Sequence, residues 1–227
     1  MYDRIDSTNR FLLSALKDGT LKPPICVGAL QQVEGKGRYD RHWSSEPGGL
    51  YFSIATSIDK DTAVMKGYPL YYAMLLHQWL KKEFKIQDLY IKWPNDIYVN
   101  MHKLAGILTQ TVIRDPQVFF VTGIGLNVMN AIPETAVSLQ KLRPDFSYNI
   151  HAMLMQFITI ANTSVYDHAV VHDYLNKYLW GKKQQRSFSI NNEKISGIIE
   201  DVRDDFALGI RFGEENGVRY YDIGELS

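Results

Sequence analysis

Lys92-Trp93-Pro94-Asn95-Asp96, with Lys103-Leu104-Ala105-Gly106-Ile107-Leu108 seven residues on, is the most specific pattern in this sequence. Lys92 lies in an apolar stretch, 89–93, that we predict to be a strand, where an ammonium group without a partner is costly. The small residues of the second segment leave space beside it. We therefore expect a pocket for an anionic partner. The alternative is an edge-strand lysine whose ammonium group reaches solvent.

A second pattern is the loop Glu34-Gly35-Lys36-Gly37-Arg38-Tyr39-Asp40-Arg41-His42-Trp43, which holds three cations, two glycines and an indole. The whole chain has 25 basic and 25 acidic residues, so this charge is a local feature. Glycines allow the backbone to approach an anion, and Lys and Arg bind phosphate or carboxylate. A mobile, solvated surface loop is the alternative interpretation.

Two further clusters combine polar side chains with tight backbone. Asp6-Ser7-Thr8-Asn9 stands at a predicted helix start, where it can cap the helix or bind a neutral polar ligand. Thr122-Gly123-Ile124-Gly125-Leu126-Asn127 places two glycines in a predicted strand, which indicates a close approach of ligand or backbone. It is not a dinucleotide fingerprint, because no third glycine and no helix follow. No Walker-type loop occurs either, so any ATP site must be built differently.

Composition is typical of a globular protein large enough for its own core, with 227 residues of which 45% are hydrophobic. The single cysteine, Cys26, excludes an internal disulfide and is typical of a reducing compartment. We identify no signal peptide or transmembrane segment and expect a cytoplasmic protein with no membrane partner. The zero net charge disfavours a duplex nucleic-acid binder.

The order of elements predicts an α+β fold: a mixed sheet flanked by helices. We expect a helix from Ser7 to before Gly19, and a second helix that Pro69 opens. Strand 89–93 continues as 97–99 after a break, and 129–147 is a loop. The remaining predicted strands are 25–32, 50–57, 104–113 and 118–128, and the remaining helices are 149–164 and 165–179.

After Trp180 and Gly181 the sequence pattern changes to one that predicts short strands and tight turns. We predict five short strands, typical of a small barrel. This gives two domains, 1–180 and 181–227. His168 and His172 lie at i, i+4 on a helix, and we interpret them as a solvated face, because no third metal ligand accompanies them.

Together these clusters resemble the biotin–protein ligase family. The resemblance rests on Ile5 to Asn9, Gln32, the basic loop from Gly35 to Arg41 with Trp43, 92–96, 103–108 and 123–127, in the family's order. It implies a class II synthetase-like catalytic domain, the biotin–lipoate ligase fold, with a C-terminal SH3-like barrel. Lipoate ligases share the fold but not, as a rule, the first pattern.

The resemblance implies a two-step reaction. Biotin and ATP form biotinyl-5'-AMP and pyrophosphate, and a lysine of a biotin carboxyl carrier domain then takes the biotin. ATP and Mg2+ are the expected co-substrate and metal, with no tightly bound prosthetic group. Relatives often pair edge to edge through their sheets, so a homodimer is possible.

The resemblance also assigns roles to residues of this chain. The implied catalytic residues are Arg38, Lys92, Lys103 and Asp96, with Asp96 also the candidate magnesium ligand. The implied biotin-binding residues are Ser7, Thr8, Asn9, Gln32, Lys36, Gly37, Arg38, Lys92, Gly106 and Ile107. The implied ATP-binding residues are Lys36, Arg38, Arg41, Trp43, Lys103 and Asn127.

Two departures from the family pattern concern the basic loop, where Lys36 replaces an Arg and Asp40 replaces a Gly. Lysine keeps the charge at position 36 but loses the bidentate fork, and Asp40 adds a negative charge near the phosphates. Because Ser7 lies so near the first residue, we expect the short form of the family, without an N-terminal DNA-binding domain. A lipoate or octanoate ligase or transferase, or a non-catalytic sensor of the adenylate, are the alternatives.

Overall fold

The computed structural model describes residues 1–58, 62–114, 117–190, 193–213 and 217–226. Its larger sheet has seven strands in the order β1-β2-β3-β7-β6-β5-β4, and its smaller sheet has the order β11-β10-β9-β8. Strand β1 pairs in parallel with β2, and the other neighbours are antiparallel. The predicted α+β class with a mixed sheet is confirmed. The strands of the larger sheet are Tyr2–Ile5 (β1), Ile25–Gln32 (β2), Leu50–Ile58 (β3), Leu89–Lys92 (β4), Asp96–Val99 (β5), His102–Arg114 (β6) and Gln117–Leu126 (β7).

Helix α1, Thr8–Lys17, lies on one face of the larger sheet. Ser7 is its N-cap and accepts a hydrogen bond from the backbone N–H of Arg10. Leu12 and Leu16 are fully buried against Val121 of β7 and other apolar side chains of the sheet. This packing fixes the N-terminal end of the helix, and therefore Thr8 and Asn9, above the middle of the sheet.

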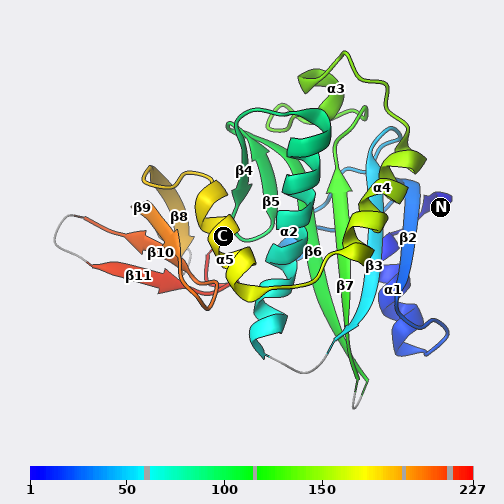
Figure 1. The fold of residues 1–227 in the computed structure, drawn as a ribbon, viewed down its shortest axis with the longest axis horizontal. Helices are drawn as coiled ribbons and strands as arrows, with labels where there is room; N and C mark the ends of the chain where they lie inside the picture. Colours follow the sequence, from blue (N-terminus) through cyan, green and yellow to red (C-terminus); the bar gives the residue numbers. More distant parts are fainter. Residues whose placement is uncertain (59–61, 115–116, 191–192, 214–216, 227) are drawn as a thin grey trace.

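Three longer helices cover the opposite face, as Figure 1 shows. They are α2 (Thr62–Phe84), α4 (Ile150–Thr163) and α5 (His168–Tyr178), and their core side chains include Leu76, Phe157 and Val171. The segment predicted as a loop, 129–147, also contains the four-residue helix α3, Leu139–Leu142. Ser138 caps it by accepting from the N–H of Lys141, a local signal too short to show periodicity.

Two predicted boundaries of the larger domain were wrong. Helix α2 begins at Thr62, so Pro69 lies inside it rather than at its start. The residues before Pro69 are themselves compatible with a helix, and Tyr68 among them is buried in the core. Strand β5 does not continue β4 but reverses onto it as an antiparallel hairpin, with Lys92 opposite Asp96. The Pro-Asn break is therefore a turn, and it brings the two ionisable side chains together.

The C-terminal sheet consists of β8 (Gln185–Ile190), β9 (Glu193–Val202), β10 (Leu208–Arg211) and β11 (Val218–Tyr221). Four strands are described here instead of the five predicted, and a single bridge between Lys182 and Ile199 adds one further pairing. This antiparallel sheet is compatible with an SH3-like unit. Figure 1 places it at one end of the molecule, beside α5.

Two histidines connect α5 to the C-terminal sheet. His168 Nε2 lies 2.8 Å from the carbonyl oxygen of Asp204, and His172 Nε2 lies 2.9 Å from that of Val202. The prediction of a merely solvated helix face was therefore wrong, because helical spacing alone does not reveal what packs against a face. Among the described residues, no helix is both long and apolar enough to cross a membrane.

His77 of α2 holds the start of β4 in place. Its Nε2 lies 2.9 Å from the carbonyl oxygen of Leu89, and its Nδ1 lies 2.8 Å from the hydroxyl of Tyr174 on α5. Burial lowers the pKa of His77 to about 4. The neutral ring, donating from Nε2, is the form that fits these partners.

This burial predicts acid sensitivity. Because the folded-state pKa lies below the unfolded value of about 6.5, the stabilisation is complete above pH 6.5 and is lost as the pH falls toward 4. We expect the free energy of unfolding to fall by about 3 kcal/mol across this range on account of His77. Urea unfolding at pH 7, 5.5 and 4 measures it. His77→Gln should flatten the pH dependence, whereas His151→Gln on the exposed face of α4 should not; equal slopes in all three proteins would contradict the assignment.

Candidate active site

A cavity of about 520 Å³ opens on the α1 face of the larger sheet, a volume suited to a small ligand. Every residue that we predicted to act in binding or catalysis lines it. They are Ser7, Thr8, Asn9, Gln32, Lys36, Gly37, Arg38, Arg41, Trp43, Lys92, Asp96, Lys103, Gly106, Ile107 and Asn127. Five segments far apart in the chain therefore meet at one place, while the individual roles stay predictions.

Strand register explains the floor of this cavity. One row of paired residues runs Gly125, Gly106, Asp96, Lys92 from the middle of the sheet to its edge. Paired residues share a face, so the glycines leave open space on the same face that carries the two ionisable side chains. A Cβ at Gly125 would lie 2.4 Å from Nε1 of Trp43, so the indole requires this glycine.

The end of the cavity nearest α1 is polar and buried. The hydroxyl of Thr8 lies 2.8 Å from that of Ser53, and Thr8 also donates to the side-chain oxygen of Gln32 through its N–H (2.9 Å) and its hydroxyl (3.1 Å). Asn9 donates from Nδ2 to the carbonyl oxygens of Leu108 and Val121, which leaves Oδ1 buried without a hydrogen-bond partner among the described residues. A buried acceptor of this kind calls for a donor from a ligand.

The other side of the cavity is cationic. Lys92 Nζ lies 3.3 Å from the hydroxyl of Tyr98, and burial lowers the pKa of this lysine, an effect that Asp96 partly opposes. Lys103 Nζ lies 2.8 Å from Oδ1 of Asp96 and 4.9 Å from the ring centroid of Trp43. Asp96 thus pairs with the ammonium group of Lys103 and, in the strand register, lies opposite Lys92.

The basic loop forms a tight hairpin over the cavity. Trp43 N–H donates to the carbonyl oxygen of Gly35 at 2.9 Å, and Gly37 N–H donates to that of Arg41 at 2.7 Å. A Cβ at Gly35 would lie 2.4 Å from the carbonyl oxygen of Trp43, so the turn needs a glycine there. The Nε1 of Trp43 is buried without a partner among the described residues. The side chain of Asp40, the departure noted in the sequence, lies outside the described residues.

Tyr39 links this loop to the C-terminal segment. Its hydroxyl lies 3.3 Å from the carbonyl oxygen of Gly224 and 3.2 Å from that of Leu226, and it accepts from Arg38 Nη2 at 2.9 Å. Tyr39 has φ of 54°, a left-handed conformation that these contacts hold in place. Leu226 itself lines the cavity.

We expect Tyr39→Phe to loosen the loop. Losing these hydrogen bonds should raise the rate of trypsin cleavage after Arg38 and Arg41 by about threefold to tenfold, since each such bond contributes roughly 1 kcal/mol. Mass spectrometry of timed digests gives the rate. Tyr2→Phe, on the exposed edge strand β1, is the control. Equal cleavage of the wild-type and Tyr39→Phe proteins would show that the contact does not restrain the loop.

Several residues that line the cavity are not among those predicted from the sequence. Ser53 was detectable, because it is a polar residue within the apolar strand β3 and is fully buried. Trp180, Arg186 and Phe188 belong to the start of the C-terminal region and reach the cavity only through tertiary packing. No local pattern marks them.

Comparison with known proteins agrees with this geometry. A sequence model of the biotin/lipoate A/B protein ligase family matches residues 1–127. The bifunctional ligase/repressor BirA of Escherichia coli is 34% identical over 138 residues, which cover 59% of this chain and 42% of that protein. The protein of the same name from Salmonella typhimurium is 29% identical over 238 residues, 98% of this chain and 72% of that one. The chain thus spans less than half of the E. coli relative.

Solved structures share the fold. The biotin protein ligase from Aquifex aeolicus, in complex with biotin and ATP, superimposes with a TM-score of 0.80 at 21% identity, covering 100% of this chain and 96% of that one. A biotin acetyl coenzyme A carboxylase synthetase from Helicobacter pylori gives 0.67 at 24% identity, covering 96% and 97%. The family model matches more than half of the residues and includes all the residues predicted from the sequence to bind or catalyse, so this chain belongs to the biotin/lipoate A/B protein ligase family.

Proposed function

We propose that this protein is an ATP-dependent biotin–protein ligase. The observation that carries the proposal is a single cavity with two different ends. A buried cluster of neutral donors and acceptors lies at one end, cations lie at the other, and glycines form the floor between them. Such a cavity suits a substrate with a neutral polar head and a carboxylate tail, beside a nucleotide. The names of the relatives and the ligands in the Aquifex structure support the same reading.

The neutral end suits the ureido ring of biotin. A ureido group offers two N–H donors and one carbonyl acceptor, and Asn9 Oδ1 is a buried acceptor with no partner among the described residues. The hydroxyls of Thr8 and Ser53, 2.8 Å apart, can each donate or accept. Gln32 orients Thr8, and Ser7 remains the helix cap. A ring without these polar groups would leave Asn9 unsatisfied, which favours biotin over lipoate.

In the first step, an oxygen of the biotin carboxylate forms a bond to the α-phosphorus of ATP. The bond from that phosphorus to the α,β-bridging oxygen breaks, and pyrophosphate leaves with the electron pair. Two anions must meet, so cations have to offset their repulsion. We assign this to Lys92 and Arg38, with Lys103, Lys36 and Arg41 on the phosphates. Trp43 and Asn127 hold the adenine, and Gly106 and Ile107 border the apolar part of biotin.

Magnesium fits this site as part of the nucleotide complex. Among the described residues no cluster of three His, Cys, Asp or Glu side chains could hold a metal, and Asp96 is the one carboxylate that lines the cavity. Mg2+ is commonly bound by one or two carboxylates together with substrate phosphates, and this donor set agrees with that mode. The ion would neutralise phosphate charge, and Asp96 would orient it while keeping its contact to Lys103.

In the second step, the amine nitrogen of an acceptor lysine attacks the acyl carbon of the adenylate. The bond from that carbon to the phosphate oxygen breaks, AMP leaves, and the amine gives up a proton. The acceptor we propose is a biotin carboxyl carrier domain in the cytoplasm. We also propose a division near residue 180 into a catalytic and a C-terminal domain. Strand β1, an exposed edge of the larger sheet, would be available for a homodimer.

Pyrophosphate–ATP exchange tests the proposal. Purified protein with Mg2+ is supplied separately with biotin, lipoate or octanoate, and transfer of label from pyrophosphate into ATP is measured. We expect exchange with biotin alone. Exchange with lipoate or octanoate would move the assignment to another branch of the same family. Tight biotin binding by calorimetry with no exchange for any acid would replace the ligase by a non-catalytic sensor.

A further inference from the structure

The edge of the cavity beyond Lys92 is built by the C-terminal region, which the family match does not reach. Trp180, Arg186 and Phe188 line this edge. Leu179 forms a bridge with Ile91, so the chain after α5 continues directly along the outer side of strand β4. The row Gly125, Gly106, Asp96, Lys92 therefore ends against Trp180 and the first strand of the C-terminal sheet.

The ring of Trp180 is held by a hydrogen bond and makes cation–π contacts with two basic side chains. Its indole N–H donates to the carbonyl oxygen of Asn100 at 2.6 Å. Lys92 Nζ lies 5.0 Å from the ring centroid, and Arg186 Cζ lies 4.5 Å from it. A pinned aromatic ring thus holds Arg186 near the lysine that we place at the reacting carboxylate.

Arg186 lines the cavity, and no carboxylate is described among its hydrogen-bond partners. Its terminal nitrogens contact only neutral acceptors nearby, the carbonyl oxygen of Gln185 at 3.2 Å, the side-chain oxygen of Gln184 and, at 4.0 Å, the sulfur of Met101. Its Nε is buried and has no hydrogen-bond partner among the described residues, and no ion pair is described for it. Gly181, with φ of 72°, lets Arg186 approach closely, since a Cβ there would lie 3.1 Å from this Nε. A cationic side chain that lines a cavity, holds only neutral acceptors and leaves one buried N–H donor unpaired indicates that a ligand supplies the missing acceptor.

The charge of the surroundings identifies that ligand as an anion. Of the described residues that line the cavity, one is acidic, Asp96, and six are basic: Lys36, Arg38, Arg41, Lys92, Lys103 and Arg186. Arg186 and Arg41 both help to lower the pKa of Lys92, after the larger effect of burial. Cations that repel one another at a common site are tolerated when a polyanion binds between them.

We infer that Arg186 binds the β- and γ-phosphates of the nucleotide, the half that departs as pyrophosphate. The inference rests on the proposed function and extends it to the C-terminal sheet. The adenine is assigned to Trp43 and Asn127 near the middle of the sheet, and the carboxylate and α-phosphate meet near Lys92. The phosphate chain then runs outward along the row of paired residues, and its last two phosphates reach Arg186. A planar fork suits two phosphate oxygens at once.

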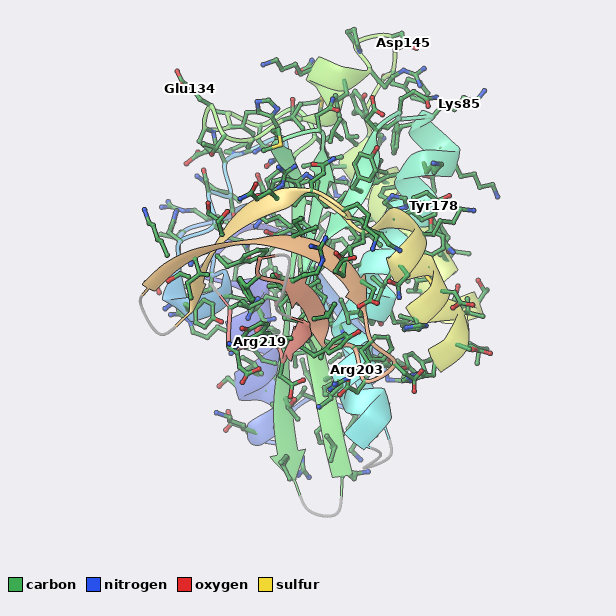
Figure 2. The ribbon with its side chains drawn as sticks, turned by 90° about the vertical axis from the view of Figure 1, so that its left-hand side faces the viewer. Lys85, Glu134, Asp145, Tyr178, Arg203 and Arg219 are labelled. Carbon is green, nitrogen blue, oxygen red and sulfur yellow. The ribbon has the colours of Figure 1, made fainter. Side chains whose placement is uncertain are left out.

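Binding of pyrophosphate alone tests the inference without catalysis. Calorimetry with Mg2+ and pyrophosphate is compared for the wild-type protein, Arg186→Gln, Arg186→Lys and Arg219→Gln. We expect Arg186→Gln to weaken binding about 10- to 100-fold and Arg186→Lys to weaken it less, because charge is kept and the fork is lost. Arg219 lies on β11 and does not line the cavity, and Figure 2 shows it at the C-terminal sheet, so its variant is the charge-matched control.

Three further measurements distinguish a phosphate-binding role of Arg186 from other roles. The affinity for biotin should stay within about twofold in all variants, because the neutral end is untouched. In exchange assays Arg186→Gln should raise the KM for pyrophosphate. Unchanged pyrophosphate affinity in a folded Arg186→Gln or Arg186→Lys protein overturns the inference, as does a defect confined to transfer onto the acceptor, which would place Arg186 at the partner surface instead. Failure of the wild-type protein to catalyse exchange contradicts the proposed function but leaves the binding result decisive for Arg186.

Discussion

Replacing Lys92 with methionine is expected to slow biotin-dependent pyrophosphate exchange by a factor of about 10³ while the protein stays folded. Methionine keeps the unbranched apolar stem between Tyr98 and Trp180 and removes only the charge. The ammonium group is already partly desolvated, as its lowered pKa indicates, so its attraction to a developing phosphate charge is weakly screened. Exchange under saturating biotin and ATP measures the loss.

Two measurements make this result specific. Lys82→Met, an exposed lysine of α2, removes the same charge from the opposite face and should exchange at the wild-type rate. Biotin binding by Lys92→Met should weaken far less than exchange slows, because the ureido contacts remain. Wild-type exchange by Lys92→Met would exclude this lysine from the chemistry and leave its position beside Trp180 purely structural.

Removing Lys103 is expected to cost about 10²-fold in exchange, and neutralising Asp96 in the same chain should restore part of it. The side chains of Lys103 and Asp96 are 28% and 17% exposed, and their charged atoms lie 2.8 Å apart. In Lys103→Met the carboxylate of Asp96 faces the phosphates without the ammonium group that pairs with it. This unpaired negative charge repels ATP. Asp96→Asn removes that repulsion but also the magnesium contact proposed for this carboxylate, so only part of the loss is restored.

A double-mutant cycle measures this coupling. Exchange rates of Lys103→Met, Asp96→Asn and the double variant are compared at subsaturating ATP, where binding of the nucleotide contributes. We expect the double variant to be faster than Lys103→Met. If the two losses multiply instead, the ion pair carries no coupling, and the two residues act on the nucleotide independently.

The larger sheet was predictable because most of its strands are marked by local runs of apolar residues. Strand β2 was predicted with its observed bounds, 25–32, and the apolar run from Leu50 made β3 clear. Glycines and cations of the site were also identifiable, since residue type and spacing alone suggest anion binding. What sequence spacing could not give was the row that sets Lys92 beside Asp96, because that depends on the hairpin between β4 and β5.

The C-terminal contribution to the site was not predictable for a different reason. Trp180 and Arg186 look like ordinary residues of a linker and a short strand, and their role depends on docking across α5 and β4. Ser53 was predictable only in part. A polar residue within a buried strand indicates a functional position, but its role becomes clear only from its contact with the hydroxyl of Thr8, 45 residues away in the chain.

The hydrogen bonds between Tyr39 and the C-terminal segment limit which sequence changes this protein can accept during evolution. The two acceptors are main-chain oxygens, so the link does not depend on which side chain stands at position 226, although burial in the core requires that side chain to be apolar. A Cβ at Gly224 would meet no atom within 4 Å, so its φ of 117° is what disfavours a side chain there. Inheritance of the link therefore depends on chain length and path. An insertion or deletion between β11 and residue 224 would abolish it, whereas the exchange of Leu226 for another apolar residue would preserve it.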